Sequence, residues 1–266
     1  MAGHGGASGM KLRKDVRAVV MDLDDTLISA YRHPDLVWRV VCRQFRSELG
    51  VLEADEAAHA LTRAGAAFWD DPDRHALGRL DPLGARRIIV AEAFRALGEG
   101  GRRPPSPQVG ELMADAFSLR RDRDMRLEPG AHAVLVHLRE AGYRLALLTN
   151  GAGPLQRAKI ERFDLTSRFH HIQIEGEVGL GKPDPAAFNK VFEALAVDPA
   201  AVCMVGDSLE WDIRPARTLG CRTALYDPEA PNGDQADQVG ADIVVRTLES
   251  LLIHFPGPRG RDQTRI

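Results

Sequence analysis

Short apolar segments recur regularly between residues 129 and 245 of this chain, with helical patterns between most of them. The apolar segments are "YRLALLT", "FHHIQI", "AVCMVG", "TALYD" and "ADIVV". Parallel strands must be joined by crossover connections, usually helices, so this order predicts a parallel sheet with helices on both faces. The segment "RAVVMD" at 17–22 has the same character and predicts one more strand. The expected fold class is therefore α/β, with a Rossmann-like parallel sheet.

About 100 residues without a comparable apolar strand follow this first strand. They contain amphipathic helical patterns such as "DLVWRVVCRQFRSELG" and "ARRIIVAEAFRALG". Two stretches rich in Gly, Pro and Asp, at 69–84 and 98–107, are expected to interrupt the helices as loops. We therefore expect an α/β core of residues 15–30 and 129–255, an inserted helical domain of residues 31–128, and flexible tails at 1–14 and 256–266.

Composition restricts the kind of partner. The chain has 266 residues, 44% of them hydrophobic, which is enough to bury a core. Its formal charge of −3 provides no broad basic surface, so we expect no nucleic-acid partner and no membrane partner. No apolar run reaches the ~18 residues of a membrane span. The three cysteines, Cys42, Cys203 and Cys221, lie far apart. Reduced thiols in the cytoplasm are therefore the expectation.

Polar residues stand directly after the predicted strands. In an open parallel sheet, ligands bind outside the carboxyl ends of the strands, so these side chains are expected to meet there. Together they supply carboxylates for a metal, a hydroxyl and a fixed positive charge, which is what the handling of a phosphoryl group requires. They are Asp22, Asp24, Thr149, Asn150, Lys182 and Asp207.

Four short motifs carry a resemblance to a known family. "DLDDT" at 22–26, "LLTNG" at 147–151, "GKPDP" at 181–185 and "VGDSLEWD" at 205–212 resemble the motifs of the haloacid dehalogenase-like superfamily, in order and spacing. One motif alone would be a weak signal, but the four together are highly specific. The helical insert resembles the C1-type cap of that family. Residues 145–228 are most similar to the branch that includes N-acylneuraminate 9-phosphatase, pyrimidine 5′-nucleotidase and flavin mononucleotide phosphatases.

The acidic residues receive distinct expected roles. Asp22 closes its strand and is placed to attack phosphorus and form an aspartyl-phosphate intermediate. Asp24 would protonate the leaving alkoxide and then activate water. The resemblance implies Mg²⁺ between Asp22, the backbone carbonyl of Asp24 and Asp207, while Asp212 binds the metal directly, acts through water or orients its neighbours. Asp25 is not fixed by the family pattern and is expected to be an exposed turn residue.

The remaining motif residues are expected to hold phosphate. Thr149, Asn150 and Gly151 precede a helix whose start is marked by Pro154, where a hydroxyl and free N–H groups can bind phosphate oxygens. Lys182 is expected to be the counter-charge to both Asp22 and the transferred phosphoryl group. The segment Asp184–Pro185 would then supply the N-cap and first residue of the next helix.

The leading hypothesis is a Mg²⁺-dependent phosphatase acting on a small phosphorylated metabolite. A 2-haloacid dehalogenase or a phosphonate hydrolase of the same family typically lacks the acid found here as Asp24, and a sugar-phosphate mutase usually has a hydrophobic residue in place of Thr26. A phosphoacceptor switch domain would lack the helical insert. A non-catalytic binding protein would be expected to have lost at least one of Asp22, Asp24, Lys182 and Asp207, and all four are present. The sequence leaves both monomer and homodimer open. It also leaves open whether the arginines Arg79, Arg86 and Arg87 face the site or solvent.

Overall fold

The computed structural model describes residues 16–231 and 239–255, and the tails expected at 1–14 and 256–266 lie outside the described residues. The chain divides into two compact units. One unit contains the chain up to Ile28, Leu127–Asn150 and the residues from Pro154 onward; the other contains Ser29–Arg126 and Gly151–Gly153. Among the described residues, no helix combines the length and the apolar character needed to cross a bilayer.

A six-stranded sheet with the strand order β5-β4-β1-β6-β7-β8 forms the centre of the first unit. All five strand pairs are parallel, and Val20 in β1 is in register with Ala146 of β4 and Met204 of β6. This confirms the expected α/β fold class. The strands are β1 (Ala18–Met21), β4 (Arg144–Thr149), β5 (His171–Ile174), β6 (Val202–Gly206), β7 (Arg222–Tyr226) and β8 (Ile243–Val245).

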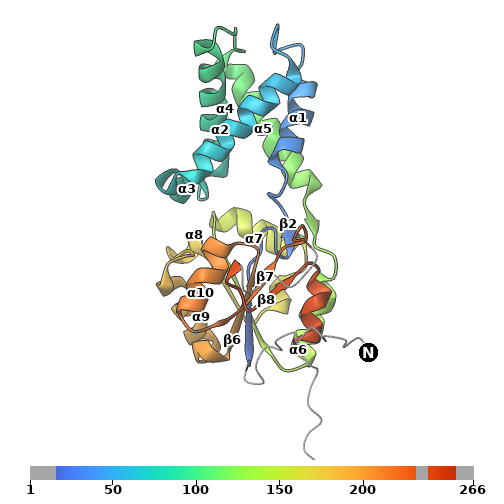
Figure 1. Ribbon diagram of the computed structural model, residues 1–266, viewed down its shortest axis with the longest axis vertical. Coiled ribbons are helices and arrows are strands. Elements are labelled where there is room, and N and C mark those ends of the chain that lie inside the picture. The colour runs from blue at the N-terminus through green and yellow to red at the C-terminus, as the bar shows by residue number, and fades with distance from the viewer. Residues whose placement is uncertain (1–15, 232–238, 256–266) are drawn as a thin grey trace, which may run out of the picture. The chain divides into compact units, whose positions relative to one another are not determined.

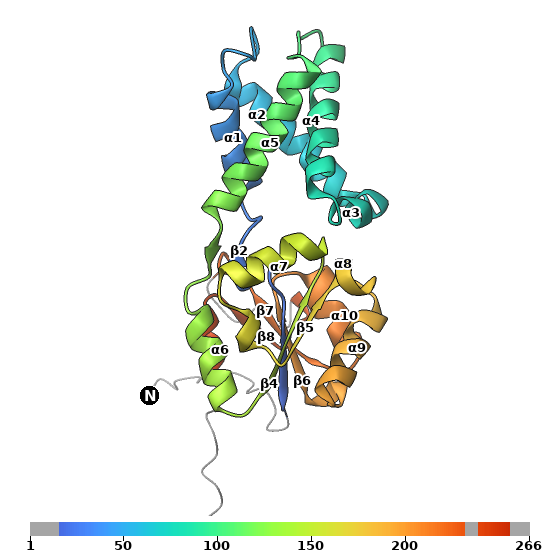
Figure 2. The ribbon, with the colours of Figure 1, turned by 180° about the vertical axis from the view of Figure 1, so that it is seen from behind.

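Helices cover both faces of this sheet (Figures 1 and 2). Phe188 and Val191 of one helix pack with Val20, Leu148 and Met204 in a continuous core cluster. That helix begins as its sequence predicts, because Asp184 accepts a hydrogen bond from the backbone N–H of Ala186. The helices of this unit are α6 (Ala131–Glu140), α7 (Gly153–Arg162), α8 (Glu175–Val178), α9 (Pro185–Leu195) and α10 (Arg214–Thr218), with short turns η1 (Thr166–Arg168), η2 (Pro199–Ala201), η3 (Leu209–Ile213) and η4 (Leu248–Ile253).

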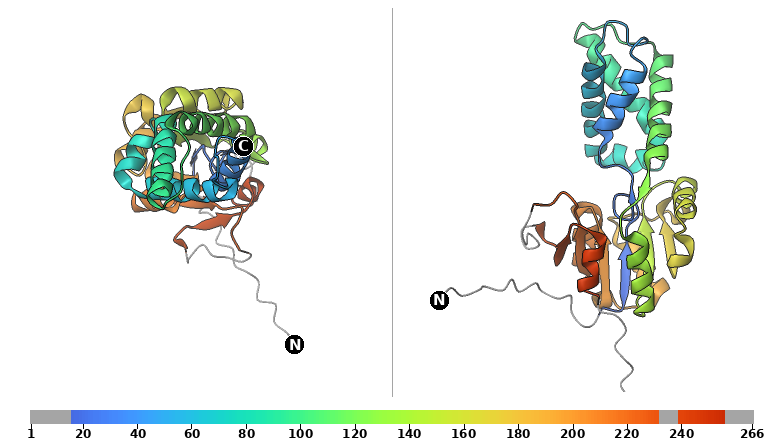
Figure 3. Two further views of the ribbon diagram at one scale, coloured as in Figure 1. Left: turned by 90° about the horizontal axis from the view of Figure 1, so that it is seen from above. Right: turned by 90° about the vertical axis from the view of Figure 1, so that its right-hand side faces the viewer.

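The second unit is helical, and α1, α2, α4 and α5 each pack against two of the others (Figure 3). Its core contains Trp38 and Phe117, whose rings stack with centroids 4.0 Å apart, together with Leu61, Phe94 and Met113. The helices are α1 (Pro34–Gln44), α2 (Ala54–Asp70), α3 (Pro72–Gly78), α4 (Pro82–Glu99) and α5 (Pro107–Asp124). Strands β2 (Ile28–Ser29) and β3 (Arg126–Leu127) pair where the chain enters and leaves this unit.

The expectation that 69–84 is a loop is wrong in part, because α3 and the start of α4 lie there. The Asp and Pro residues that suggested a break begin helices instead. Asp71 accepts hydrogen bonds from the N–H groups of Asp73 and Arg74, and Asp81 accepts one from Gly84. Each acid is followed directly by a proline at the first helical position, where a missing N–H costs nothing.

Candidate active site

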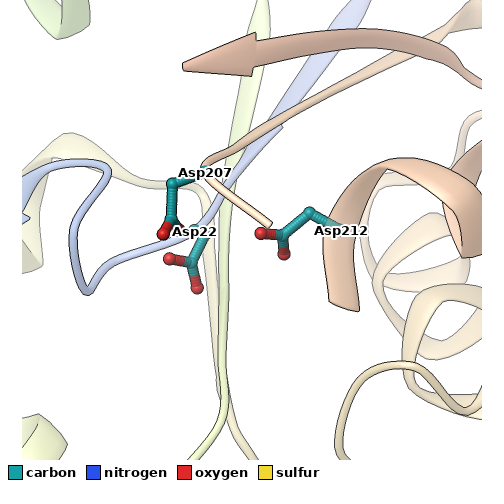
Figure 4. Close-up of side chains that lie close together, drawn as sticks. All are labelled: Asp22, Asp207 and Asp212. Atoms are coloured by element: carbon teal, nitrogen blue, oxygen red, sulfur yellow. The ribbon is translucent and has the colours of Figure 1, made fainter. Parts of the chain in front are cut away.

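Three carboxylates converge at the carboxyl ends of β1 and β6 (Figure 4). Asp22 directly follows β1, Asp207 directly follows β6, and Asp212 lies in the turn after it. Each offers a carboxylate oxygen, and these three oxygens lie within 4.8 Å of one another. The two strands are neighbours in the sheet, and parallel pairing brings their ends to the same edge. The structure thus brings together three of the acids that the sequence singled out.

Lys182 lies between two of these acids. Its Nζ donates hydrogen bonds to Asp22 Oδ1 at 2.5 Å and to Asp212 Oδ1 at 2.6 Å. The Lys182 side chain is buried, so solvent screens these contacts little. Burial alone would lower the pKa of Lys182, but the carboxylates of Asp212 and Asp22 raise it above its ordinary value. Lys182 is therefore a fixed positive charge at the centre of the cluster.

The side chain of Asn150 holds the backbone of Lys182. Asn150 Nδ2 donates to the Lys182 carbonyl oxygen at 2.7 Å, and the Lys182 N–H donates to Asn150 Oδ1 at 2.7 Å. The sequence had suggested Asn150 as a phosphate ligand, whereas both polar atoms of its amide are occupied by Lys182. Gly151 follows with a φ of 116°, in the left-handed region that favours glycine. The end of β4 therefore positions the loop that contains Lys182.

The turn η3 positions Asp212. Asp212 Oδ2 accepts a hydrogen bond from the N–H of Ser208 at 3.1 Å, and Ser208 Oγ accepts one from the N–H of Trp211 at 3.1 Å. The turn has π-helical geometry, which is frequent at functional sites. A Cβ built at Gly206 would overlap the Asp212 carboxylate, so only glycine leaves room for it. Residues 209–218 thus consist of η3 followed directly by α10.

Burial and mutual repulsion disfavour charge on these acids. Desolvation, together with the carboxylates of Asp212 and Asp24 and against the opposing effect of Lys182, raises the pKa of Asp22 from 3.8 to about 7. Asp207 keeps part of its surface open to solvent, but its surroundings also desolvate it. With the carboxylates of Asp22 and Asp212, this raises the pKa of Asp207 from 3.8 to about 8. When all three carboxylates of the cluster are ionised, the single positive charge of Lys182 is therefore not enough to neutralise them.

These donors suit a hard divalent cation. Mg²⁺ prefers oxygen ligands, and the three carboxylates provide them close together. A cation would also offset the repulsion that raises the pKa values of Asp22 and Asp207. Thr26 Oγ1 donates to Asp207 Oδ1 at 3.2 Å, which orients one of these carboxylates. By the chemistry of its donors, the cluster fits Mg²⁺.

Asp24 lies in a separate set of contacts that sequence reasoning missed. Lys159 Nζ donates to both oxygens of the Asp24 carboxylate, at 2.7 and 2.8 Å. Gln156 Nε2 donates to Asp24 Oδ2 at 2.9 Å and to Thr149 Oγ1 at 2.7 Å. Gln156 and Lys159 are three apart on α7 and so share one helix face. This spacing, just after the "LLTNG" motif, could have marked both residues as candidates but does not indicate Asp24 as their partner.

Asp25 is buried, which corrects the expectation of an exposed turn residue. The chain turns sharply after β1: the Asp25 N–H donates to the Ile28 carbonyl oxygen at 2.6 Å, and the Leu27 N–H donates to that of Leu23 at 2.9 Å. Asp25 has a φ of 60°, a conformation that Asp tolerates better than most residues. The tight turn carries its side chain inward.

Comparisons with known proteins agree with this geometry. The family model described as haloacid dehalogenase-like hydrolase matches residues 16–220. A phosphoserine phosphatase of Thermus thermophilus is 35% identical over 89% of this chain and 100% of its own length. The N-acylneuraminate-9-phosphatase of Rattus norvegicus is 39% identical over 79% of this chain and 82% of its own length, which confirms the expected similarity to that branch.

Solved structures agree on the fold. A haloacid dehalogenase-like phosphatase from Thermococcus onnurineus superposes with a TM-score of 0.59 at 23% identity, covering 92% of this chain and 100% of its own. At this identity the likeness concerns the fold alone. The family model, by contrast, spans well over half of the chain and includes every strand-end residue described above. The chain belongs to the haloacid dehalogenase-like hydrolase family.

Proposed function

We propose that this protein is a Mg²⁺-dependent phosphatase that hydrolyses a small phosphomonoester through an aspartyl-phosphate intermediate on Asp22. The observation that carries the proposal is the buried contact of 2.5 Å between Lys182 Nζ and Asp22 within the three-carboxylate cluster. The proposed nucleophile, its proposed counter-charge and the candidate metal ligands lie close together there, which supports the proposal. Two curated relatives that match most of this chain are named as phosphatases, which supports the same reaction.

The first half-reaction forms the phosphoenzyme. A carboxylate oxygen of Asp22 attacks phosphorus in line with the leaving oxygen, the P–O bond to the leaving group breaks, and Asp24 gives its proton to the departing alkoxide. Lys182 stabilises the negative charge of the transferred group and of Asp22. Mg²⁺ held by Asp22, Asp207 and the Asp24 carbonyl, with Asp212 nearby, would neutralise charge on the phosphoryl oxygens.

The second half-reaction regenerates the enzyme. Asp24 takes a proton from water, and the water oxygen attacks the phosphorus of the acyl phosphate. The bond from phosphorus to the Asp22 oxygen breaks, which releases inorganic phosphate and restores the carboxylate. Lys159 and Gln156 fix the position of the Asp24 carboxylate. The Thr149 hydroxyl and the backbone around Gly151 are candidates to bind phosphate oxygens. Asp24 thus donates a proton in the first half-reaction and accepts one in the second.

Two further assignments belong to this proposal. Residues 31–128 would act as the cap that selects the leaving group, on the core formed by 15–30 and 129–255. The cysteines Cys42, Cys203 and Cys221 are buried and free of disulfides, which suits the reducing cytoplasm.

Phosphate release from a metabolite panel tests the reaction. The panel contains phosphoserine, glyceraldehyde 3-phosphate, sugar phosphates, nucleotides and flavin mononucleotide, each assayed with Mg²⁺ and with EDTA. We expect Mg²⁺-dependent release from one chemical class, and a loss of roughly 10³-fold or more in Asp22→Asn. Asp198→Asn is the matched control, because Asp198 only caps a distant short turn through the Ala200 N–H. Phosphate release that persists unchanged in EDTA, or in pure Asp22→Asn, would contradict the proposal.

A further inference from the structure

Gln156 of α7 connects two groups that the proposed reaction uses for different purposes. Its Nε2 donates to Asp24 Oδ2 at 2.9 Å and to Thr149 Oγ1 at 2.7 Å. Asp24 is the proposed acid and base, and the Thr149 hydroxyl is a candidate phosphate ligand. All three residues belong to the α/β unit. One side-chain amide therefore contacts both the proton-transfer group and the candidate phosphate-binding group.

The orientation of the Gln156 amide follows from its contact with Asp24. Both oxygens of the Asp24 carboxylate accept from Lys159 Nζ, and Oδ2 also faces Gln156. An acceptor oxygen requires the NH₂ end of the amide to face it, because the carbonyl end would place two acceptors in contact. The same NH₂ group also faces Thr149, and its two N–H bonds account for the two contacts.

This orientation fixes the direction in which the Thr149 hydroxyl can donate. Because Oγ1 accepts from Gln156, its own O–H must point toward another acceptor. The structure provides the Asn150 carbonyl oxygen at 3.3 Å, which is longer than the ~2.8 Å usual for a hydroxyl donor. The hydroxyl proton is therefore weakly held and available to a closer oxygen.

Thr149 lies near the proposed nucleophile. Strands β4 and β1 are neighbouring parallel strands, in which Leu147 is in register with Met21. Asp22 directly follows Met21, and Thr149 is the last residue of β4, so both lie at the same edge of the sheet. A phosphoryl group on Asp22 would bring its oxygens to this edge.

Burial favours keeping this hydrogen bond intact. The side chains of Gln156 and Thr149 are almost completely buried, and the bond joins α7 to the end of β4. A hydrogen bond shielded from water is electrostatically stronger, and leaving either group unpaired there is costly. We propose that Gln156 is a positioning residue that holds the Thr149 hydroxyl as a hydrogen-bond donor to a phosphoryl oxygen of the substrate. The assignment to substrate rests on the proposed phosphatase function.

A double-mutant cycle on phosphate binding tests the proposal. The probe is inorganic phosphate, and its dissociation constant comes from the rise of the unfolding midpoint with phosphate concentration in the presence of Mg²⁺. Thr149→Val removes the hydroxyl but keeps a similar shape, and Gln156→Met removes the amide but keeps a similar length. Each single change should weaken phosphate binding about 10-fold, because a hydrogen bond to a charged group is lost or misdirected.

The double variant separates positioning through Thr149 from an independent structural role. If Gln156 acts through the hydroxyl, adding Gln156→Met to Thr149→Val should weaken phosphate binding by less than about 3-fold further. In Thr149→Ser, which keeps the hydroxyl, Gln156→Met should again cost about 10-fold. Single losses that multiply to about 100-fold in the double variant would overturn the proposal, as would wild-type phosphate affinity in Gln156→Met.

Glu161→Gln is the matched control, because this exposed residue of α7 lies outside the network, and it should bind phosphate as the wild type does. Gln156→Asn has an amide that is one methylene shorter and cannot reach both partners. It provides the same cycle if Gln156→Met does not unfold cooperatively.

Failure of the proposed phosphatase function is a separate result. It would show as no Mg²⁺-dependent turnover of p-nitrophenyl phosphate by the wild type, and the phosphate-binding cycle would still test the link between Gln156 and Thr149. Absence of phosphate binding by the wild type would overturn the present proposal directly.

Discussion

Lys159 Nζ lies 2.7 and 2.8 Å from the two carboxylate oxygens of Asp24, so a single ammonium group contacts both oxygens of the proposed acid and base. Both side chains are largely buried, with exposed fractions of 10% for Lys159 and 19% for Asp24. Gln156 adds a further hydrogen bond from the same helix face. Asp24 is therefore held in one position before any substrate arrives.

Lys159→Met should impair proton transfer more than phosphoryl binding. We expect kcat/KM on an alkyl phosphate such as glycerol 3-phosphate to fall about 100-fold, since general acid catalysis contributes that much or more. The kcat/KM for p-nitrophenyl phosphate should fall far less, because this ratio reports formation of the phosphoenzyme, in which nitrophenolate leaves without protonation. Lys159→Arg should recover part of the loss, and Lys190→Met, an exposed lysine of α9, is the control. Equal losses on the two substrates would argue against a positioning role for Lys159.

Asn150→Ala should reduce activity by releasing Lys182. The substitution removes both hydrogen bonds between the Asn150 amide and the Lys182 backbone. We expect the free energy of unfolding to fall by about 1–3 kcal/mol, the usual cost of leaving such groups unpaired, and kcat to fall about 10-fold or more. Chemical denaturation and steady-state kinetics measure the two effects. Asn189→Ala, on the exposed side of α9, should change neither.

Gly206→Ala should weaken metal binding. The added methyl group would overlap the Asp212 carboxylate and push it from Lys182 and from the Ser208 N–H. We expect a higher Mg²⁺ concentration for half-maximal activity, measured by titration of the metal. Gly65→Ala is the control, because the nearest atom to its added carbon is 3.9 Å away. An unchanged Mg²⁺ requirement in the Gly206 variant would mean that Asp212 does not contribute to the metal site.

Much of the core followed from local signals in the sequence. Apolar strands that end in polar residues predicted the sheet and the meeting of Asp22 and Asp207, because parallel strands bring their carboxyl ends to one edge. The place of Asp212 beside them was implied by the family resemblance. The capping of α9 by Asp184 was visible for a similarly local reason. In contrast, Asp71 and Asp81 resemble loop residues until the helix that follows each one is known. Asp-Pro pairs can end one element or begin the next, and only packing decides between these outcomes.

Other features depended on contacts between distant segments. Lys159 and Asp24 are 135 residues apart in sequence, so no local pattern could pair them. Asn150 was assigned to phosphate because its motif is near a helix start, whereas its amide binds the backbone at Lys182. The burial of Asp25 followed from a tight turn with a positive φ, which sequence periodicity does not report. These side-chain partners required the tertiary structure.

The acidic cluster should make the metal-free protein less stable as pH rises. The pKa values of Asp22 and Asp207 increase on folding, from 3.8 to about 7 and about 8, so the folded state binds more protons than the unfolded state between these values. Stability from these two groups is therefore fully present below about pH 4 and is lost as pH approaches 8. Above the pKa values that Asp22 and Asp207 have in the folded state, this stabilisation is lost completely, and a further rise in pH no longer changes the repulsion between the two carboxylates.

Thermal unfolding in EDTA across this pH range measures the effect. Asp207→Asn should flatten the fall in the unfolding midpoint between pH 6 and pH 8, because it removes one of the two titrating carboxyl groups. In the wild type, Mg²⁺ should raise the midpoint more at pH 8 than at pH 6, since a cation binds carboxylates only after their protons have left. Asp198→Asn should keep the wild-type pH dependence, because it leaves the cluster unchanged. A wild-type midpoint that rises from pH 6 to pH 8 in EDTA, while Asp207→Asn shows the same rise, would mean that these carboxyl groups are not protonated on folding.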